Sequence, residues 1–208
     1  VTILQWEAHA ILRHYKPEII AVTGSVGKTS AKEAIFEVLK NTGRVRKSEK
    51  SYNSEIGMPL TVIGKENAWY SLFGWLSIIF SGLRIIFYHQ NNYPEMLILE
   101  AGADRPGDIG RFVGVARPHI AVVTAIGEIP VHIEFFSGVE AVALEKSKLI
   151  KDLHSRDIAI LNFDDAIVFG MKEKTRARVF TYGFGEGADV RAEHYHIMVK
   201  EENGEIPE

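Results

Sequence analysis

The 208-residue sequence contains no cysteine, which excludes a disulfide framework and a thiolate-bound metal site. It also has no excess of basic charge, because 24 Lys and Arg residues stand against 27 Asp and Glu, for a formal net charge of -3. A chain of that charge has no broad positive field for DNA or RNA, so we expect no nucleic-acid partner. Neither a secretory signal pattern nor an internal repeat is recognisable, and we therefore expect one cytoplasmic domain.

The apolar fraction of 46% is sufficient to fill one core. Short apolar runs recur along the chain, separated by segments with helical spacing, and they cover residues 18–23, 95–102, 119–126 and 157–163. Continuous rather than alternating hydrophobicity is typical of strands buried on both faces of a parallel sheet. In residues 178–183 and 188–204, apolar and polar residues instead alternate, and glycines between them suit a turn, which predicts a small antiparallel edge. The sequence therefore predicts an α/β fold, with a mostly parallel sheet flanked by helices and an antiparallel edge near the C-terminus.

Residues 69–88, WYSLFGWLSIIFSGLRIIFY, form the longest apolar segment and have the length of a membrane span. Small and polar residues recur at steps of three or four along one side of the predicted helix, namely Ser71, Gly74, Ser77, Ser81 and Arg84. A spanning helix rarely carries an arginine on such a stripe. We expect a helix packed on protein, with contact to a membrane surface, which Trp69 and Trp75 favour, as the alternative.

Residues 20–32, IAVTGSVGKTSAK, place two glycines between a predicted strand and a predicted helix. Gly24 and Gly27 allow backbone N–H groups to converge on an anion at the helix N-terminus. Lys28 is then placed to reach the outer phosphates of a nucleotide, and the Thr29 hydroxyl to join a magnesium ion. The general phosphate-loop pattern has a further glycine where this chain has Val22. The alternative is a tight strand-to-helix turn with a solvated lysine.

The helix that follows this loop, predicted over residues 29–39, has an apolar stripe. Residues at helical spacing form it, and we expect them to face the core: Ala31, Ala34, Ile35 and Val38.

Two further segments carry candidate site residues. Glu100 ends the apolar run LILE just before a glycine turn, and the carboxyl ends of buried strands form the edge where α/β sheets bind ligands. Lys146 falls on the apolar face of a predicted helix, where an amine is costly unless it is paired or neutral. From the residues alone, Glu100 can equally be a loop acid, and Lys146 can extend its head to solvent. From the residues alone the role of His132 is also undecided, since a lone histidine can be a structural hydrogen-bonding residue rather than a ligand.

Together these motifs resemble the central, ATP-binding domain of the Mur ligase family, in the branch that adds D-alanyl-D-alanine to a peptidoglycan precursor. The family's shortened loop, T-G-x-x-G-K-T/S, matches residues 23–29 and has no earlier glycine. The segment SYNSEIGMP resembles the family's Asn-rich stretch before I-G-x-P, and LEAGA resembles E-x-G-A. HIEFFS and LNFDD also match family segments in the family's order. The resemblance covers about residues 17–190.

The resemblance also implies residue roles. The nucleotide would be held by the loop and by three residues beyond it: Gly24, Ser25, Val26, Gly27, Lys28, Thr29, Ser30, Asn53, Asn162 and Asp165. Magnesium would be organised by Thr29, Glu100 and His132, together with Lys146 in the carbamylated form that the family uses. Lys28, Lys146 and His132 would be the catalytic residues.

A Mur ligase transfers the γ-phosphate of ATP to a substrate carboxylate, and an amine then attacks the acyl phosphate to form an amide. The resemblance thus implies ATP and Mg²⁺ as cofactors and a UDP-muramoyl peptide-like substrate. We expect residues 1–208 to be the central domain alone, with a helical lead-in at residues 1–16 and without the flanking domains for the UDP-sugar and the incoming amine. The alternatives are a folylpolyglutamate synthase-like ligase and a non-catalytic nucleotide-binding module that uses residues 69–88 for a partner.

Overall fold

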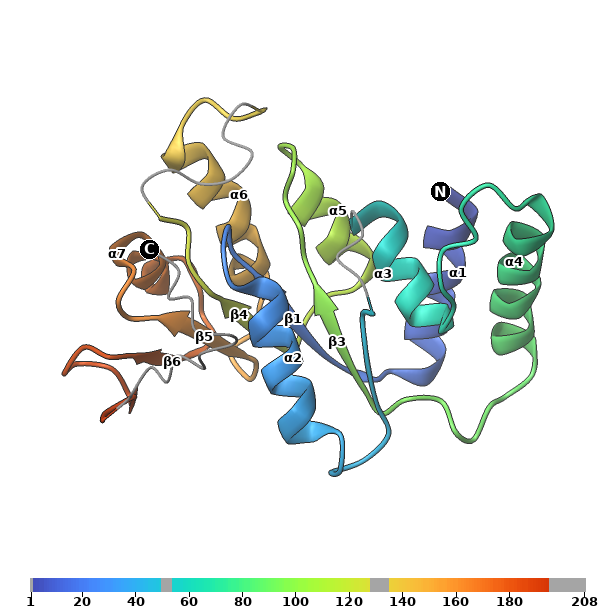
Figure 1. Cartoon of the computed structure of the whole chain (residues 1–208), viewed down its shortest axis with the longest axis horizontal. Coiled ribbons are helices and arrows are strands. Elements are labelled where there is room, and N and C mark those ends of the chain that lie inside the picture. The colour runs from blue at the N-terminus through green and yellow to red at the C-terminus, as the bar shows by residue number, and fades with distance from the viewer. Residues whose placement is uncertain (1, 50–53, 128–134, 195–208) are drawn as a thin grey trace, which may run out of the picture.

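The computed structural model describes residues 2–49, 54–127 and 135–194. The helices are α1 Thr2–Tyr15, α2 Lys28–Leu39, α3 Ser54–Ile63, α4 Leu72–Phe87, α5 Asp108–Val115, α6 Val139–Lys151, α7 Ala166–Phe169 and the 3-10 helix η2 Gly170–Lys174. The strands are β1 Glu18–Thr23, β2 Val45–Lys47, β3 Met96–Glu100, β4 Ile120–Val123, β5 Ile158–Asn162, β6 Arg178–Gly183 and β7 Val190–Arg191. Strands and helices alternate along much of the chain (Figure 1), which confirms the predicted α/β class.

The strands form one seven-stranded sheet in the order β2-β3-β1-β4-β5-β6-β7, and every pair of neighbours is parallel. The chain leaves β1 toward β2 on one side of the sheet and continues from β4 toward β5 on the other. The strand order therefore reverses between β1 and β4. In open α/β sheets, the crevice outside the carboxyl ends of the strands at such a point is the usual ligand site.

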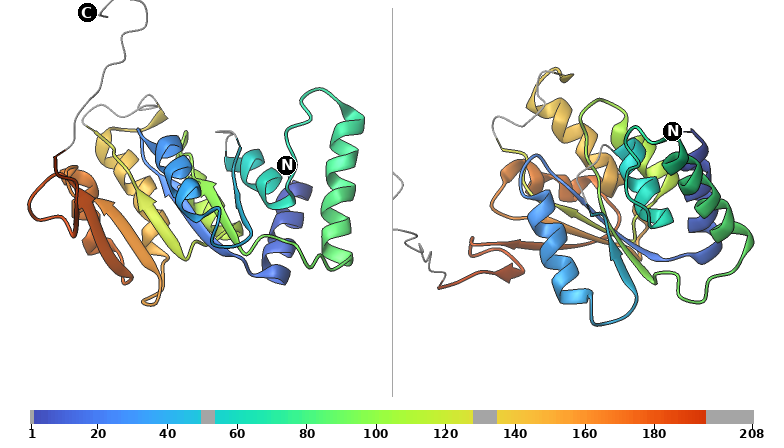
Figure 2. Two further views of the ribbon diagram at one scale, coloured as in Figure 1. Left: turned by 60° about the horizontal axis from the view of Figure 1, so that its bottom comes forward. Right: turned by 45° about the vertical axis from the view of Figure 1, so that its right-hand side comes forward.

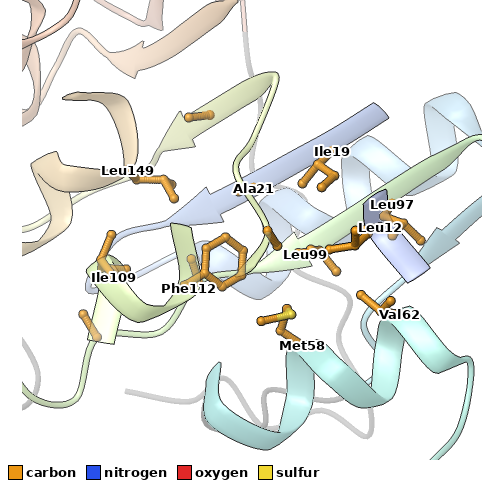
Figure 3. Close-up of a cluster of buried hydrophobic side chains, with 14 of the residues drawn as sticks. Leu12, Ile19, Ala21, Met58, Val62, Leu97, Leu99, Ile109, Phe112 and Leu149 are labelled. Atoms are coloured by element: carbon orange, nitrogen blue, oxygen red, sulfur yellow. The ribbon is translucent and has the colours of Figure 1, made fainter. Parts of the chain in front are cut away.

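The strands are apolar on both faces because both faces are covered. Ile19, Ala21 and Leu99 belong to the larger core with α1, α3, α5 and α6 (Figure 3), whereas Ile20 and Val22 pack against α2 on the other side. This alternation follows from the two-residue period of a strand. Figures 1 and 2 show α2 alone on its side of the sheet, with the other helices across from it. The continuous apolar runs in the sequence are thus explained.

The predicted inward stripe of α2 is wrong in two of its positions. Val38 is 75% exposed and Ala34 is exposed, while Lys32 is fully buried. Lys32 is stable there because its Nζ donates to the Ser48 carbonyl at 2.7 Å and lies 3.1 Å from a Glu33 carboxylate oxygen. The helix is therefore turned so that the apolar stem of a lysine, rather than a valine, faces the protein.

The predicted antiparallel edge is also wrong where the structure describes it, because β7 runs parallel to β6. The Asp189 carboxylate accepts hydrogen bonds from the N–H and the hydroxyl of Thr181, both at 2.8 Å. Residues 184–189 therefore curl back beside β6, and the chain enters β7 in the same direction. Residues 195–204 of the predicted edge lie outside the described residues.

Helix α4 confirms the helix predicted within residues 69–88 and packs on protein with one face. Ser71 caps it by accepting from the Gly74 N–H, and its buried residues Ile78, Gly82 and Ile85 face α1 and α3. Helix α1 contributes Leu4, Ala8, Ile11 and Leu12 to the main core, so the lead-in is part of the fold. Among the described residues, no helix is long and apolar enough to cross a membrane.

The contact between α1 and α4 contains a buried carboxyl group, that of Glu7. Its side chain is inaccessible to solvent, and within the described structure neither carboxylate oxygen has a hydrogen-bond partner. It fits against α4 because position 82 is glycine, where an added Cβ would lie 2.5 Å from Oε2 of Glu7. Burial raises the pKa of Glu7 from 4.5 to about 7.

Glu7→Gln is expected to change the pH dependence of stability. The folded chain keeps the Glu7 proton up to about pH 7, whereas the unfolded chain releases it near pH 4.5. The contribution of Glu7 to the unfolding free energy is therefore fully present below about pH 4.5 and is lost as the pH rises through 7. The glutamine variant should gain up to about 3 kcal/mol in unfolding free energy over the wild type at about pH 8 and almost nothing at about pH 4. Urea denaturation at both pH values measures this, with the exposed Glu18→Gln as control. A gain that does not depend on pH would contradict the assignment.

Candidate functional site

The predicted site residues lie at one edge of the sheet because parallel strands end together. Val22 of β1 is level with Glu100 of β3 on one side and with Val122 of β4 on the other. The glycine loop after β1, the acid that ends β3 and the loop after β4 therefore meet at the point where the strand order reverses.

The glycine loop is held against the end of β4. Gly24 has a φ of 149°, and a Cβ at this position would lie 2.0 Å from the Thr124 hydroxyl oxygen. That hydroxyl donates to the Val26 carbonyl at 2.6 Å, and the Ser25 N–H donates to the Ala125 carbonyl at 2.6 Å. A side chain at position 24 would separate these groups, so the first glycine is required by close approach and by conformation.

The second glycine starts the helix. Gly27 is the N-cap of α2 with a φ of 83°, in the left-handed region that favours glycine. The first N–H groups of a helix have no carbonyl partner within it, and together with the helix dipole they attract an anion. Lys28 folds back over the loop, with its Nζ 3.3 Å from the Ser25 carbonyl oxygen. Ser30, two residues further along α2, is exposed. The loop thus places a cation beside the helix terminus.

Thr29 and Glu100, which are 71 residues apart in the sequence, are in contact at this edge. The Thr29 hydroxyl donates to Oε2 of Glu100 at 3.1 Å. A hydroxyl oxygen and a carboxylate oxygen are ligands that Mg²⁺ accepts. The sequence interpretation assigned both residues to one ion, and the structure brings these two side chains together.

Lys146 is buried beneath the loop. Its side chain is 3% exposed, and its Nζ donates to the Gly24 carbonyl oxygen at 3.0 Å. Burial, together with the charge of Lys28, lowers the pKa of Lys146 to about 8, although Asp104 and Glu145 oppose the shift. The alternative in which the head of this lysine extends to solvent is therefore excluded. An amine with such a pKa is partly neutral near physiological pH.

The sequence interpretation missed Glu145, which orients the helix that carries Lys146. Its buried carboxylate accepts the Ile109 N–H at 3.0 Å and pairs with Lys148 at 2.6 Å. Burial alone would raise the pKa of Glu145, but Lys148 and the N–H groups of Gly107 and Ile109 outweigh it and lower the pKa. The residue thus ties α6 to the start of α5. The segment EKSK shows only a charged pair, so its sequence gives little sign of this role.

Asn162 and Asp165 follow β5 at the same edge, and their described contacts are with the backbone. The Asn162 side-chain oxygen accepts the Asp164 N–H at 3.0 Å. Asp165 caps α7 and also accepts the N–H groups of Ile126 and Gly127, at 2.7 and 3.1 Å. Burial alone would raise the pKa of Asp165, but these backbone donors outweigh it and lower the pKa. Asp165 therefore holds the loop after β4, to which the glycine loop is bonded.

Two predicted site residues, Asn53 and His132, lie outside the described residues. Within the part of the chain that the structure describes, no group of three or more His, Cys, Asp or Glu side chains is arranged to hold a metal ion. Geometry therefore supports the metal assignment only through Thr29 and Glu100.

Two known proteins resemble this chain over most of its length. UDP-N-acetylmuramoyl-tripeptide–D-alanyl-D-alanine ligase of Mycobacterium leprae is 33% identical over 167 residues, which are 80% of this chain and 27% of that protein. The crystal structure of MurF ligase from Thermotoga maritima in complex with ADP has a TM-score of 0.67 and 30% identity, over 89% of this chain and 37% of that one.

A third relative is more distant. Folylpolyglutamate synthase of Mycobacterium tuberculosis, solved with ADP and AMPPCP, has a TM-score of 0.51 at 13% identity, over 86% of this chain and 47% of that one. At that identity the likeness shows the fold alone.

The chain spans only about a quarter to two-fifths of the length of the first two relatives. The family model described as Mur ligase middle domain matches residues 82–206, which is more than half of the chain. The glycine loop precedes the matched residues, so its assignment depends on the geometry above. The chain therefore belongs to the Mur ligase family, of which it has the middle domain.

Proposed function

We propose that this chain is the ATP-binding part of a cytoplasmic ligase that forms an amide bond in a peptidoglycan precursor. The observation that carries the proposal is the arrangement of the glycine loop at the start of α2, with the Thr29–Glu100 contact in front of it and Lys146 bonded to Gly24 beneath it. Identity of 30% or more to a UDP-N-acetylmuramoyl-tripeptide–D-alanyl-D-alanine ligase and to a MurF ligase favours this function over a folylpolyglutamate synthase-like one.

In this proposal the loop residues from Gly24 to Ser30 bind the phosphates of ATP. Their N–H groups and the dipole of α2 favour the anion, and Lys28 places positive charge near the outer phosphates. Asn53, Asn162 and Asp165 are assigned to the nucleotide by resemblance. For Asp165 the observed backbone contacts support an indirect role, in which it holds the loop that in turn holds Ser25 and Val26.

Thr29 and Glu100 fit a magnesium ion by their chemistry, since they bring hydroxyl and carboxylate oxygens together. When bound, Mg²⁺ neutralises the charge on the β- and γ-phosphates. His132 and a carbamate on Lys146 complete the proposed set by resemblance. Carbamylation replaces a buried cation by an anion, and the burial and lowered pKa of Lys146 support it, because only a neutral amine adds to CO₂.

The reaction proposed for the complete protein has two steps. The γ-phosphate passes from ATP to a carboxylate of a UDP-muramoyl peptide, which gives ADP and an acyl phosphate. The amine of an incoming amino acid or dipeptide then attacks the acyl carbon, loses a proton and releases phosphate. Lys28 stabilises charge in the first step by its position at the loop.

Lys28→Ala should weaken binding of ATP by roughly ten- to a hundredfold, the range of one charge-assisted contact. Isothermal calorimetry with and without magnesium measures this, and Lys40→Ala at the other end of α2 is the control. Equal affinity for ATP in the wild type and in Lys28→Ala would contradict the assignment of this loop to ATP binding.

Lys146 should form a carbamate in ¹³C-labelled bicarbonate. The neutral amine becomes the major form above a pH of about 8, so the carbamate signal should rise as the pH is increased through that value. Carbon NMR of the wild type, Lys146→Arg and the control Lys148→Ala tests this. Loss of the signal in Lys148→Ala, with retention in Lys146→Arg, would show that Lys148 rather than Lys146 forms the carbamate, and would contradict the proposal.

The 208-residue chain should bind ATP but form no amide bond, because ligation requires the acyl phosphate and the amine to be held together while water is excluded. The assay supplies ATP, magnesium, a UDP-muramoyl peptide and D-alanyl-D-alanine, and mass spectrometry detects the extended peptide. The full-length Thermotoga maritima MurF ligase serves as the positive control. Extended peptide from this chain alone would show that the middle domain suffices.

A further inference from the structure

Helix α4 presents a large apolar surface that the proposed nucleotide site does not use. Eight large side chains in and beside it are exposed, and several are more than two-thirds accessible: Trp69, Tyr70, Leu72, Phe73, Leu76, Phe80, Phe87 and Tyr88. Together they expose on the order of 1,000 Å² of mainly apolar surface, well above the few hundred Å² of an ordinary patch. We call these eight residues the α4 surface.

The helical members of the α4 surface share one side of the helix. At 100° per residue, Leu72, Leu76, Phe80 and Phe73 lie within an arc of about 100°, and Phe87 falls inside it. The opposite side carries the buried Ile78, Gly82 and Ile85. Arg84 is exposed and lies just beyond the rim of the apolar arc. The helix thus has two apolar sides, one that packs on the protein and one that faces outward.

The charge around this surface is opposite to that of the whole chain. Residues 67–94 contain no Asp or Glu and, apart from His89, only one ionisable cation, Arg84, although the chain as a whole has a net charge of -3. Across residues 2–18 and 64–95 the exposed cations are Arg13, Lys16, Lys65 and Arg84, and the exposed acids are Glu18, Glu66 and Glu95, of which Glu95 is paired with Arg44. This distribution is complementary to an anionic surface.

We propose that the α4 surface binds the face of an anionic lipid bilayer, with α4 lying parallel to the membrane plane. Aromatic rings at both ends, Trp69 and Tyr70 before the helix and Tyr88 after it, suit the headgroup layer, and the aliphatic and phenyl side chains between them suit the acyl boundary. Arg84 at the rim can place its charge among lipid phosphates.

The position of α4 is compatible with this orientation. It lies at the end of the molecule opposite to β6 and packs on α1 and α3 (Figures 1 and 2), so a bilayer there leaves the loop after β1 accessible. A symmetric contact between two copies through the same surface is the competing arrangement, because such an interface uses one patch on both copies.

The three tryptophans of the chain, Trp6, Trp69 and Trp75, are all on α1, α4 or the segment before α4. Because Trp69 belongs to the α4 surface and is exposed, tryptophan fluorescence responds to burial of this surface in the unaltered protein. With vesicles of phosphatidylglycerol and phosphatidylethanolamine, we expect a blue shift and quenching by lipids brominated on the acyl chains. With vesicles of phosphatidylcholine alone, we expect much weaker binding. No shift and no quenching with the anionic vesicles would overturn the proposal.

Variants distinguish a lipid surface from a protein partner. Phe73→Ser with Phe80→Ser should reduce partitioning onto the anionic vesicles by roughly tenfold or more, and Arg84→Glu should reduce it by a smaller factor. The matched control, Val38→Ser with Phe184→Ser, removes two exposed apolar side chains elsewhere and should bind as the wild type does. Circular dichroism verifies folding. Equal vesicle binding by both double variants would overturn the proposal, as would a wild-type dimer in light scattering that the α4 variant alone abolishes.

Discussion

The close approach of Gly24 to Thr124 is the constraint on which the proposed site depends. It brings the loop after β1 against the end of β4. There the Thr124 hydroxyl donates to the carbonyls of Thr23 and Val26, and the Ala125 carbonyl accepts the N–H groups of Ser25 and Val26. With the loop fixed there, α2 begins at the edge of the sheet and directs its N-terminus toward Glu100. Parallel pairing of β3, β1 and β4 then determines which side chains can meet.

The charged side chains at this edge lie on two sides of the glycine loop. Lys28 and Thr29 face outward at the start of α2, while Lys146 lies beneath the loop and bonds to its backbone. Burial lowers the pKa of Lys146, and the positive charge of Lys28 lowers it further, so the two cations repel each other. Glu145 does not neutralise that amine directly, because its own partners are Lys148 and the start of α5. A site that gains anionic groups, as a nucleotide or a carbamate provides, would relieve this repulsion.

The sheet, and the meeting of the glycine loop with Glu100 at its edge, could be predicted because continuous apolar runs and glycine spacing depend on local chemistry. Lys32 could not be placed, since hydrophobic periodicity treats lysine as polar and does not reveal that the Ser48 carbonyl and the Glu33 carboxylate will interact with its amine. The direction of β7 depends on the Asp189–Thr181 contact, which alternation cannot reveal. For Asp165, four backbone N–H groups from two segments define its structural role, and such a contact is invisible in the sequence.

The central claim is that the N-terminus of α2 binds nucleotide phosphates next to a metal ion held by Thr29 and Glu100. A crystal structure of the chain with a non-hydrolysable ATP analogue and Mn²⁺ tests it most directly, because the anomalous signal of manganese locates the ion without reference to the proposed contacts. The account predicts the phosphates within hydrogen-bonding distance of the loop between Gly24 and Ser30, and manganese beside the Thr29 hydroxyl and the Glu100 carboxylate. Phosphates or manganese bound away from this loop would contradict it.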